Sequence, residues 1–226
     1  MAELILALDT PRGIDALRLL DQLPAVQWVK VGSILMTREG PDLIRQLIGR
    51  GLNVFLDLKW HDIPNTVAGA VTAAREIGVS MATVHTLGGS VMLEAAAVAA
   101  ADEVILIGVT VLTSHDALGY GRAVGRIEVD LAAEAERHAL VAAAAGLHGV
   151  VCSAREVSLL RGRLGPDARI VVPGIRRQGD PAGDQARVAS AKDAVANGAT
   201  HLVIGRPILQ APDPASAFDQ FLQEAQ

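Results

Sequence analysis

Residues 79–111 read VSMATVHTLGGSVMLEAAAVAAADEVILIGVTV and contain one full period of a pattern that runs through the whole chain. An apolar run at residues 79–84 is followed by a short turn, an alanine-rich segment that Ser90 is placed to cap, and a second apolar run at residues 104–111. Runs of about 4 to 8 residues that are apolar throughout are typical of strands buried on both faces, as in a parallel sheet. The stretch therefore predicts a strand, a helix and a second, parallel strand.

Similar apolar runs recur along the chain, and most of them are followed by Gly, Asp, Thr or Pro. They lie at residues 4–8, 28–31, 54–58, 79–84, 104–111, 149–151, 170–172 and 202–204. Segments with helical spacing separate them, and Ser153 is placed to cap one of these helices. Gly78 and Gly198 stand where two others are expected to end.

Eight alternations of strand and helix within 226 residues, with no Pro/Ser-rich linker, match the size of one (β/α)8 barrel. We therefore expect an α/β protein with a single TIM barrel domain over residues 1–226. An open doubly wound sheet is the alternative, which is less favoured because eight parallel strands are many for so short a chain.

The composition excludes several classes of protein. A formal net charge of −5 argues against a nucleic-acid or anionic-membrane surface, and the lone Cys152 excludes a disulfide framework or a thiolate zinc site. The first residues, MAELILALD, have no basic region or cleavage site, and no apolar run approaches the roughly 20 residues that span a bilayer. We expect a cytoplasmic protein without nucleic-acid or membrane partners. Of its 20 basic residues, only Lys30, Lys59 and Lys192 are lysines.

The third apolar run and its exit, FLDLKWHDIPNT at residues 55–66, hold the densest polar cluster. Side chains alternate along a strand, so Asp57 and Lys59 should point to the same side, into the barrel at its C-terminal mouth. Burying an acid and an amine there is costly unless they pair or serve a ligand. A purely structural Asp–Lys bridge is the alternative. Asp62 lies beyond the strand, so spacing alone does not place it in the same cavity.

Two neighbouring strands carry similar residues. Asp9 ends the first run at the same mouth, and Lys30 lies between the apolar Val29 and Val31, so it too should face the interior. Two of the three lysines thus occupy inward positions in a chain that otherwise uses arginine. Because the pKa of an ammonium group is easily adjusted, this placement favours proton chemistry.

The last two runs end in a pattern that favours an anion site. Gly174 and Arg176 follow the seventh run, and Gly205 and Arg206 follow the eighth. Glycines let backbone N–H groups approach a ligand, and arginine offers bidentate contacts. Barrels often bind phosphate with the loops after these two strands.

Other features point to neither a metal nor a nucleotide cofactor. The histidines show no metal-ligand spacing, and no phosphate-binding glycine motif follows a strand. The long connection at residues 114–125 contains three glycines. It has the length of an active-site lid, although an ordinary surface loop is equally consistent with it.

These segments together resemble the orotidine 5′-phosphate decarboxylase family. The resemblance rests on LALD, VKVG, DLKWHDIPNT, VTVLTS, VVCSA, PGIRRQG…GDQ and VIGRPI, and it runs from Asp9 to Arg206. It implies a homodimeric (β/α)8 barrel that converts orotidine monophosphate to uridine monophosphate (UMP) and CO2 without a cofactor or metal. That reaction is the last step of de novo pyrimidine synthesis.

The resemblance also implies a role for individual residues. Lys59 would protonate C6 of the pyrimidine, Asp57 would lie beside the substrate carboxylate, and Lys30 would complete an alternating Lys–Asp–Lys–Asp array and contact the ribose. Asp62 and Thr66 would reach into the site of the partner subunit. The remaining implied ligands are Asp9 for the ribose, Thr113 and Ser114 for the pyrimidine side, and Arg176, Gln185, Gly205 and Arg206 for the phosphate side.

Two alternatives share this scaffold. The related 3-keto-gulonate 6-phosphate decarboxylase holds magnesium with an acidic residue on the second strand, where this chain has Lys30, whose charge would repel the ion. A non-catalytic barrel that binds a phosphate ligand is the other. It would have no need of a proton donor beside Asp57.

Overall fold

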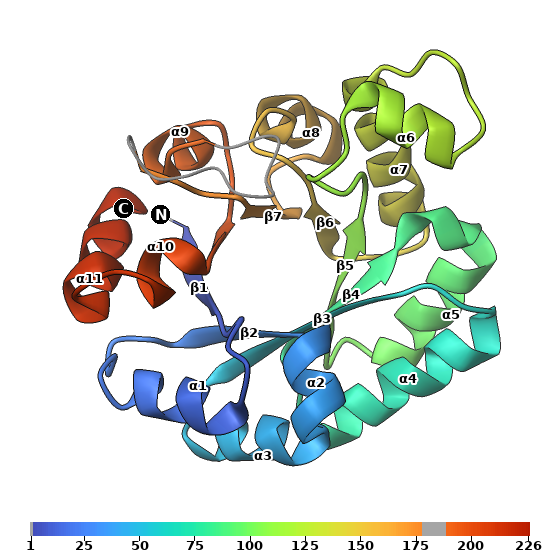
Figure 1. The fold of residues 1–226 in the computed structure, drawn as a ribbon. Coiled ribbons are helices and arrows are strands. Elements are labelled where there is room, and N and C mark those ends of the chain that lie inside the picture. The colour runs from blue at the N-terminus through green and yellow to red at the C-terminus, as the bar shows by residue number, and fades with distance from the viewer. Residues whose placement is uncertain (1, 178–188) are drawn as a thin grey trace.

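The computed structural model describes residues 2–177 and 189–226, and its eight strands close into a parallel barrel (Figure 1). The last strand pairs with the first through Leu4 and Leu202, which closes the sheet on itself. This arrangement confirms the predicted (β/α)8 barrel. The strands are β1 (Glu3–Ala7), β2 (Trp28–Gly32), β3 (Asn53–Trp60), β4 (Met81–His85), β5 (Ile105–Val109), β6 (Gly149–Val151), β7 (Arg169–Pro173) and β8 (His201–Ile204).

Helices surround the barrel on all sides (Figure 1). They are α1 (Gly13–Leu20), α2 (Ser33–Glu39), α3 (Pro41–Gly49), α4 (Pro64–Ile77), α5 (Gly89–Ala100), α6 (Ala117–Ala123), α7 (Leu131–Ala144), α8 (Val157–Leu164), α9 (Ala191–Ala196), α10 (Arg206–Leu209) and α11 (Pro214–Glu224), with a 3-10 turn η1 (Thr86–Gly88). None of them, within the described ranges, is long and apolar enough to cross a bilayer. The two ends of the chain meet, because the Ala2 N–H donates to the Ala225 carbonyl at 3.0 Å.

The apolar residues form two layers, one on each face of the barrel wall. Alternate strand residues such as Leu4 and Leu6 pack outward against the helices, in the larger layer. The residues between them point inward and fill the barrel interior; this layer consists of Ile5, Ala7, Phe55, Met81, Ile107, Val171 and Val203. Burial on both faces explains why the strands are apolar throughout.

One predicted helix cap is wrong, and the other closes the turn just before its helix. Helix α5 begins at Gly89, so Ser90 lies inside the helix and makes no cap. Helix α8 begins at Val157, and Ser153 caps the turn before it: its hydroxyl accepts a hydrogen bond from the Arg155 N–H at 3.2 Å, while its own N–H donates to Glu156 Oε2 at 2.8 Å.

The connection at residues 114–125 is more ordered than a plain loop. It contains α6, which Asp116 caps by accepting a hydrogen bond from the Gly119 N–H at 2.7 Å. Tyr120, in the middle of this helix, is buried and lies 2.9 Å from His138 Nε2 of α7. Tyr120 therefore fastens the segment to α7.

Candidate active site

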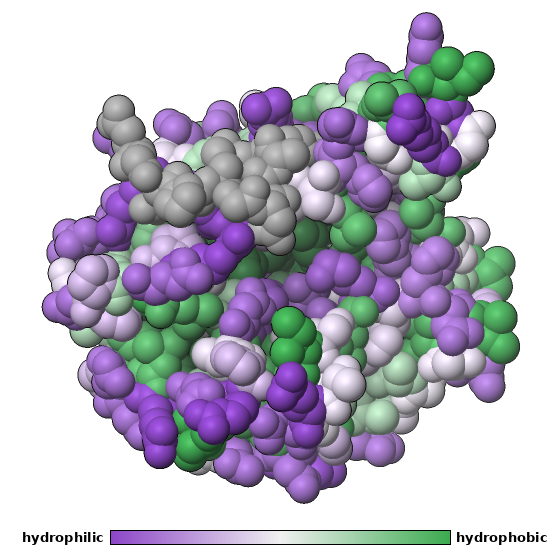
Figure 2. Space-filling model, in the orientation of Figure 1, coloured by the Kyte–Doolittle hydropathy of each residue, from purple (hydrophilic) through white to green (hydrophobic). Residues whose placement is uncertain are grey.

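A cavity of about 290 Å³ opens at the C-terminal ends of the strands. Its floor is apolar and is made by inward-facing residues of the barrel, namely Ala7, Phe55, Val151, Val171 and Val203. Figure 2 shows hydrophobic surface in the depth of this face and mostly hydrophilic surface around it. A polar ligand that lies on such a floor is held by charged side chains at the rim.

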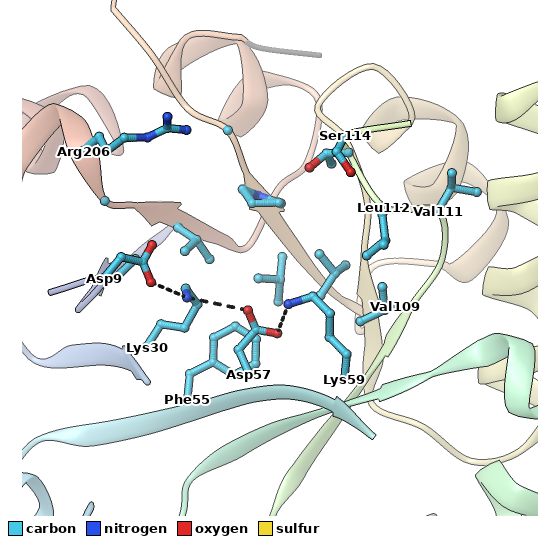
Figure 3. A pocket seen from close by; sticks show the side chains of 18 of the residues that line it. Asp9, Lys30, Phe55, Asp57, Lys59, Val109, Val111, Leu112, Ser114 and Arg206 are labelled. Atoms are coloured by element: carbon cyan, nitrogen blue, oxygen red, sulfur yellow. Dashed lines mark hydrogen bonds and ion pairs between the residues drawn. The ribbon is translucent and has the colours of Figure 1, made fainter. Parts of the chain in front are cut away.

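Four charged side chains follow one another along one side of the cavity (Figure 3). Asp9 Oδ1 lies 3.1 Å from Lys30 Nζ, which lies 3.7 Å from Asp57 Oδ2. Asp57 Oδ1 in turn accepts a hydrogen bond from Lys59 Nζ at 2.9 Å. The sign of the charge alternates at every step, so each buried charge has a neighbour that offsets its desolvation.

The environment of Asp57 keeps its carboxyl group ionised. Burial on its own raises the pKa, but the ammonium groups of Lys30 and Lys59 and the hydrogen bonds from Lys59 and Thr83 outweigh it. The pKa of Asp57 therefore lies below its ordinary value. Asp57 therefore carries a negative charge between the ammonium groups of Lys30 and Lys59.

Lys59 has an unusual backbone conformation. Its φ is +54°, in the left-handed region, and the register between β3 and β4 shifts between Leu56 and Trp60. The side chain faces the cavity as expected, but the strand is not regular there. A non-glycine residue in this region costs about 1–3 kcal/mol, and such strain tends to persist at functional sites.

The opposite rim carries the predicted anion side. Arg206 at the start of α10 and Arg176 after β7 both line the cavity, and Arg176 is mostly buried. At Gly205 a Cβ atom would lie 3.3 Å from Ala7 Cβ and 3.4 Å from Asp9 Oδ2, so a side chain there would crowd the first strand. In Figure 3 Arg206 lies on the side of Asp9, whereas Ser114 lies on the side of Lys59.

Most of the predicted site residues line this one cavity. They are Asp9, Lys30, Asp57, Lys59, Thr113, Ser114, Arg176, Gly205 and Arg206. Asp62 and Thr66 do not: both are exposed, and the Asp62 carboxylate accepts a hydrogen bond from the Ile63 N–H at 2.7 Å. Gln185 lies outside the described residues.

The sequence reasoning missed Thr83. This residue of β4 is fully buried and contacts both Asp57 and Lys59 of β3. A polar residue within the apolar run at 79–84 was a visible signal, but threonine is common in strands and carries little information alone.

The described parts of the chain show no group of three or more His, Cys, Asp or Glu side chains placed to hold a metal ion. The two carboxylates of the cavity, Asp9 and Asp57, both face the Lys30 ammonium.

Comparison with known proteins identifies the family. The sequence profile of the Orotidine 5′-phosphate decarboxylase / HUMPS family matches residues 2–221. The chain belongs to this family. Two similar proteins are named orotidine 5′-phosphate decarboxylase. The protein from Alkalilimnicola ehrlichii is 48% identical over 99% of this chain and 96% of its own length. The one from Halorhodospira halophila is 49% identical over 95% of this chain and 92% of its own length.

A solved structure with a similar fold supports the same family. The crystal structure of orotidine 5′-phosphate decarboxylase from Lactobacillus acidophilus matches with a TM-score of 0.88 at 34% identity, over 100% of both chains. The family resemblance seen in the sequence motifs is thus confirmed.

Proposed function

We propose that this protein decarboxylates orotidine 5′-phosphate to UMP and CO2, as the last step of pyrimidine synthesis. The observation that carries the proposal is the alternating Asp9–Lys30–Asp57–Lys59 array along a cavity with arginines at its other rim. A pure phosphate binder has no need of an ammonium group held against a buried carboxylate. The names of the relatives support the same reaction.

The layout of the cavity orients the substrate. The phosphate binds at Arg206 and Arg176, with backbone N–H groups near Gly205, because guanidinium groups recognise phosphate oxygens in pairs. The ribose then lies along Asp9 and Lys30. The pyrimidine comes to rest over Lys59, with Thr113 and Ser114 at its edge. Gln185 is proposed as a further phosphate ligand.

The chemistry needs one cation and one proton at C6. The bond from C6 to the carboxylate breaks, CO2 leaves, and the electron pair remains on C6. An ammonium group about 4 Å away stabilises that charge by roughly 4 kcal/mol at an effective dielectric constant of about 20. Lys59 supplies this stabilisation and then transfers its proton to C6. Asp57 lies beside the departing carboxylate.

The enzyme is proposed to act as a homodimer with shared sites. Asp62 and Thr66 are exposed at the exit of β3 and the start of α4, next to Ile63, which is 67% exposed. An exposed isoleucine between two polar residues fits a contact with a second copy of the chain. We place this dimer in the cytoplasm, with a small-molecule substrate and no nucleic-acid or membrane partner.

The alternative is a magnesium-dependent decarboxylase of a sugar phosphate. Against it stands Lys30, whose ammonium group lies between the two carboxylates that a divalent ion would use. A cation at this place repels the ion. Lys30 thus favours the reaction that needs no metal.

The deciding experiment follows the loss of orotidine 5′-phosphate absorbance with protein that was treated with EDTA. Turnover at an unchanged rate after EDTA treatment supports the proposal. No turnover, or turnover only after Mg²⁺ is added, contradicts it. 3-Keto-gulonate 6-phosphate, tested in parallel with and without Mg²⁺, separates the two reactions.

A further inference from the structure

Thr83 links the two residues of β3 that the proposed function places at the reacting carbon. Its hydroxyl oxygen lies 2.8 Å from the backbone nitrogen of Lys59 and 3.0 Å from Asp57 Oδ1. The side chain is 0% exposed and is not among the residues that line the cavity. Thr83 therefore contacts both charged residues without contacting the substrate.

The direction of both hydrogen bonds is determined by the chemistry of the partners. The Lys59 amide can only donate, so the Thr83 hydroxyl accepts from it. The hydroxyl proton is then free to point to the ionised Asp57 carboxylate, which can only accept. One hydroxyl group thus accepts a hydrogen bond from the Lys59 backbone N–H and donates one to the Asp57 carboxylate.

The irregular strand explains why a side chain is needed here. The ladder between β3 and β4 is interrupted between Leu56 and Trp60, where Lys59 takes its left-handed conformation. Its amide then bonds to the Thr83 side chain of β4. A buried N–H without a partner would be costly, so this bond stabilises the conformation that aims Lys59 into the cavity.

We infer that Thr83 is a positioning residue for the decarboxylation, which holds the Lys59 ammonium and the Asp57 carboxylate in their working geometry. This inference rests on the proposed function. Asp57 Oδ1 accepts hydrogen bonds from both Lys59 Nζ and the Thr83 hydroxyl. Without the hydroxyl, the carboxylate oxygen that binds Lys59 loses its second hydrogen bond and can rotate. Substrate binding at the arginine rim is unaffected, because Thr83 lies away from it.

The experiment compares Thr83→Val and Thr83→Ser with a matched control, Thr110→Val. Valine keeps the shape and burial of threonine but has no hydroxyl, whereas serine keeps the hydroxyl. Thr110 is also 0% exposed, but its hydroxyl donates to the carbonyl of Val151 and touches neither charged residue. The kcat and KM for orotidine 5′-phosphate, the Kd for UMP and the melting temperature are measured for each.

Thr83→Val is expected to lower kcat roughly 10- to 100-fold while KM and the Kd for UMP change less than about threefold. Thr83→Ser should restore kcat to within about threefold of wild type, and Thr110→Val should retain it. A folded Thr83→Val enzyme with wild-type kcat overturns the inference. So does a loss of kcat in Thr83→Ser or Thr110→Val as large as that in Thr83→Val, because a general packing defect then explains it.

Should Thr83→Val fail to fold, Thr83→Cys takes its place, since a thiol of similar size is a weak hydrogen-bond partner. A wild-type kcat in that variant overturns the inference, and a lowered kcat with unchanged UMP affinity supports it. Absence of turnover in the wild-type protein contradicts the proposed function itself. The inference about Thr83 is judged separately, by the ratio of kcat between the variants and an active wild type.

Discussion

Lys59 combines a charge, a partner and a strained backbone at one position. Its ammonium group lies 2.9 Å from Asp57, and its φ of +54° is held by the bond to Thr83. Strain of this kind is retained where a side chain must be aimed accurately. The structure therefore marks Lys59 as the residue on which the proposed chemistry depends most directly.

Lys59→Ala is expected to reduce kcat by at least about 10³-fold, because both the cation beside C6 and the proton donor are removed. The Kd for UMP should change only a few-fold, since the phosphate is held at the other rim. Lys192→Ala is the matched control: Lys192 is an exposed lysine of α9, and its loss should leave kcat unchanged. Steady-state kinetics and calorimetric titration with UMP check both; equal losses in the two variants would contradict the assignment.

At the scale of elements, a buried polar network fastens α6 to α7 and to the exit of β4. Thr86 Oγ1 donates to the Val109 carbonyl at 2.7 Å, so it accepts from His138 Nδ1 at 2.9 Å. Arg137 Nη2, which can only donate, lies 3.1 Å from His138 Nε2, so this nitrogen is an acceptor; the Tyr120 hydroxyl lies 2.9 Å from it. This arrangement requires the neutral form of His138.

The stability of the fold is expected to fall as the pH falls from about 6.5 to about 4. Burial, helped by the guanidinium of Arg137 and opposed by Glu134, lowers the pKa of His138 from 6.5 to about 4. Between these values the unfolded chain binds a proton that the folded chain does not, so the free energy of unfolding decreases with decreasing pH. Above pH 6.5 the contribution is fully present.

Urea unfolding at pH 7.5 and pH 5 measures this effect. His138→Gln should be less stable at pH 7.5 but should show a shallower decrease toward pH 5, because its amide does not titrate. Part of the slope remains, since burial also lowers the pKa of His85 and His201 to about 4. Parallel pH curves for wild type and variant would contradict this role of His138.

Two glycines illustrate how strand packing limits substitution. A Cβ at Gly149 of β6 would lie 1.9 Å from the Arg169 carbonyl oxygen on β7, whereas a Cβ at Gly162 of α8 would meet nothing within 4 Å. Gly149→Ala is expected to destabilise the protein by about 3 kcal/mol or more, because backbone must move. Gly162→Ala should stabilise it by about 0.5–1 kcal/mol through helix propensity. Chemical denaturation of both variants tests the pair, and equal effects would be inconsistent with the packing described.

At the scale of the whole molecule, we propose that two copies of the chain complete each site. Asp62 and Thr66 face solvent at the exit of β3, away from the cavity of their own chain. The proposed dimer with shared sites therefore assigns them to the site of a second copy.

Heterodimers purified through two different tags test this sharing. A pairing of a Lys59→Ala subunit with an Asp62→Ala subunit keeps one intact site and should show about half of the wild-type activity. The control carries both substitutions in one subunit and pairs it with a wild-type subunit; it leaves no intact site and should be nearly inactive. Sites contained within one subunit would give the opposite pattern.

Local sequence was sufficient for the strands and for the residues at their ends. The barrel, the inward Asp57 and Lys30, and the arginine rim follow from short-range rules of periodicity, because two-sided burial requires apolar runs and parallel strands bring their ends to one mouth. The chain has only three lysines, and two of them, Lys30 and Lys59, belong to the array. Helix starts were predicted less well, since α5 begins at Gly89 and Ser90 does not cap it.

The contacts that aim these residues could not be read from the sequence. Thr83 meets Lys59 and Asp57 across 24 and 26 residues of chain, and Tyr120 meets His138 across 18. Such pairs depend on how two elements lie against each other, which no local pattern encodes. Sequence periodicity was enough to name the charged residues of the array. The left-handed conformation of Lys59 and its hydrogen bond to Thr83 are decided only by the packing of β3 against β4. The reason is that the Lys59 N–H, where the ladder is interrupted, must find its acceptor on the neighbouring strand.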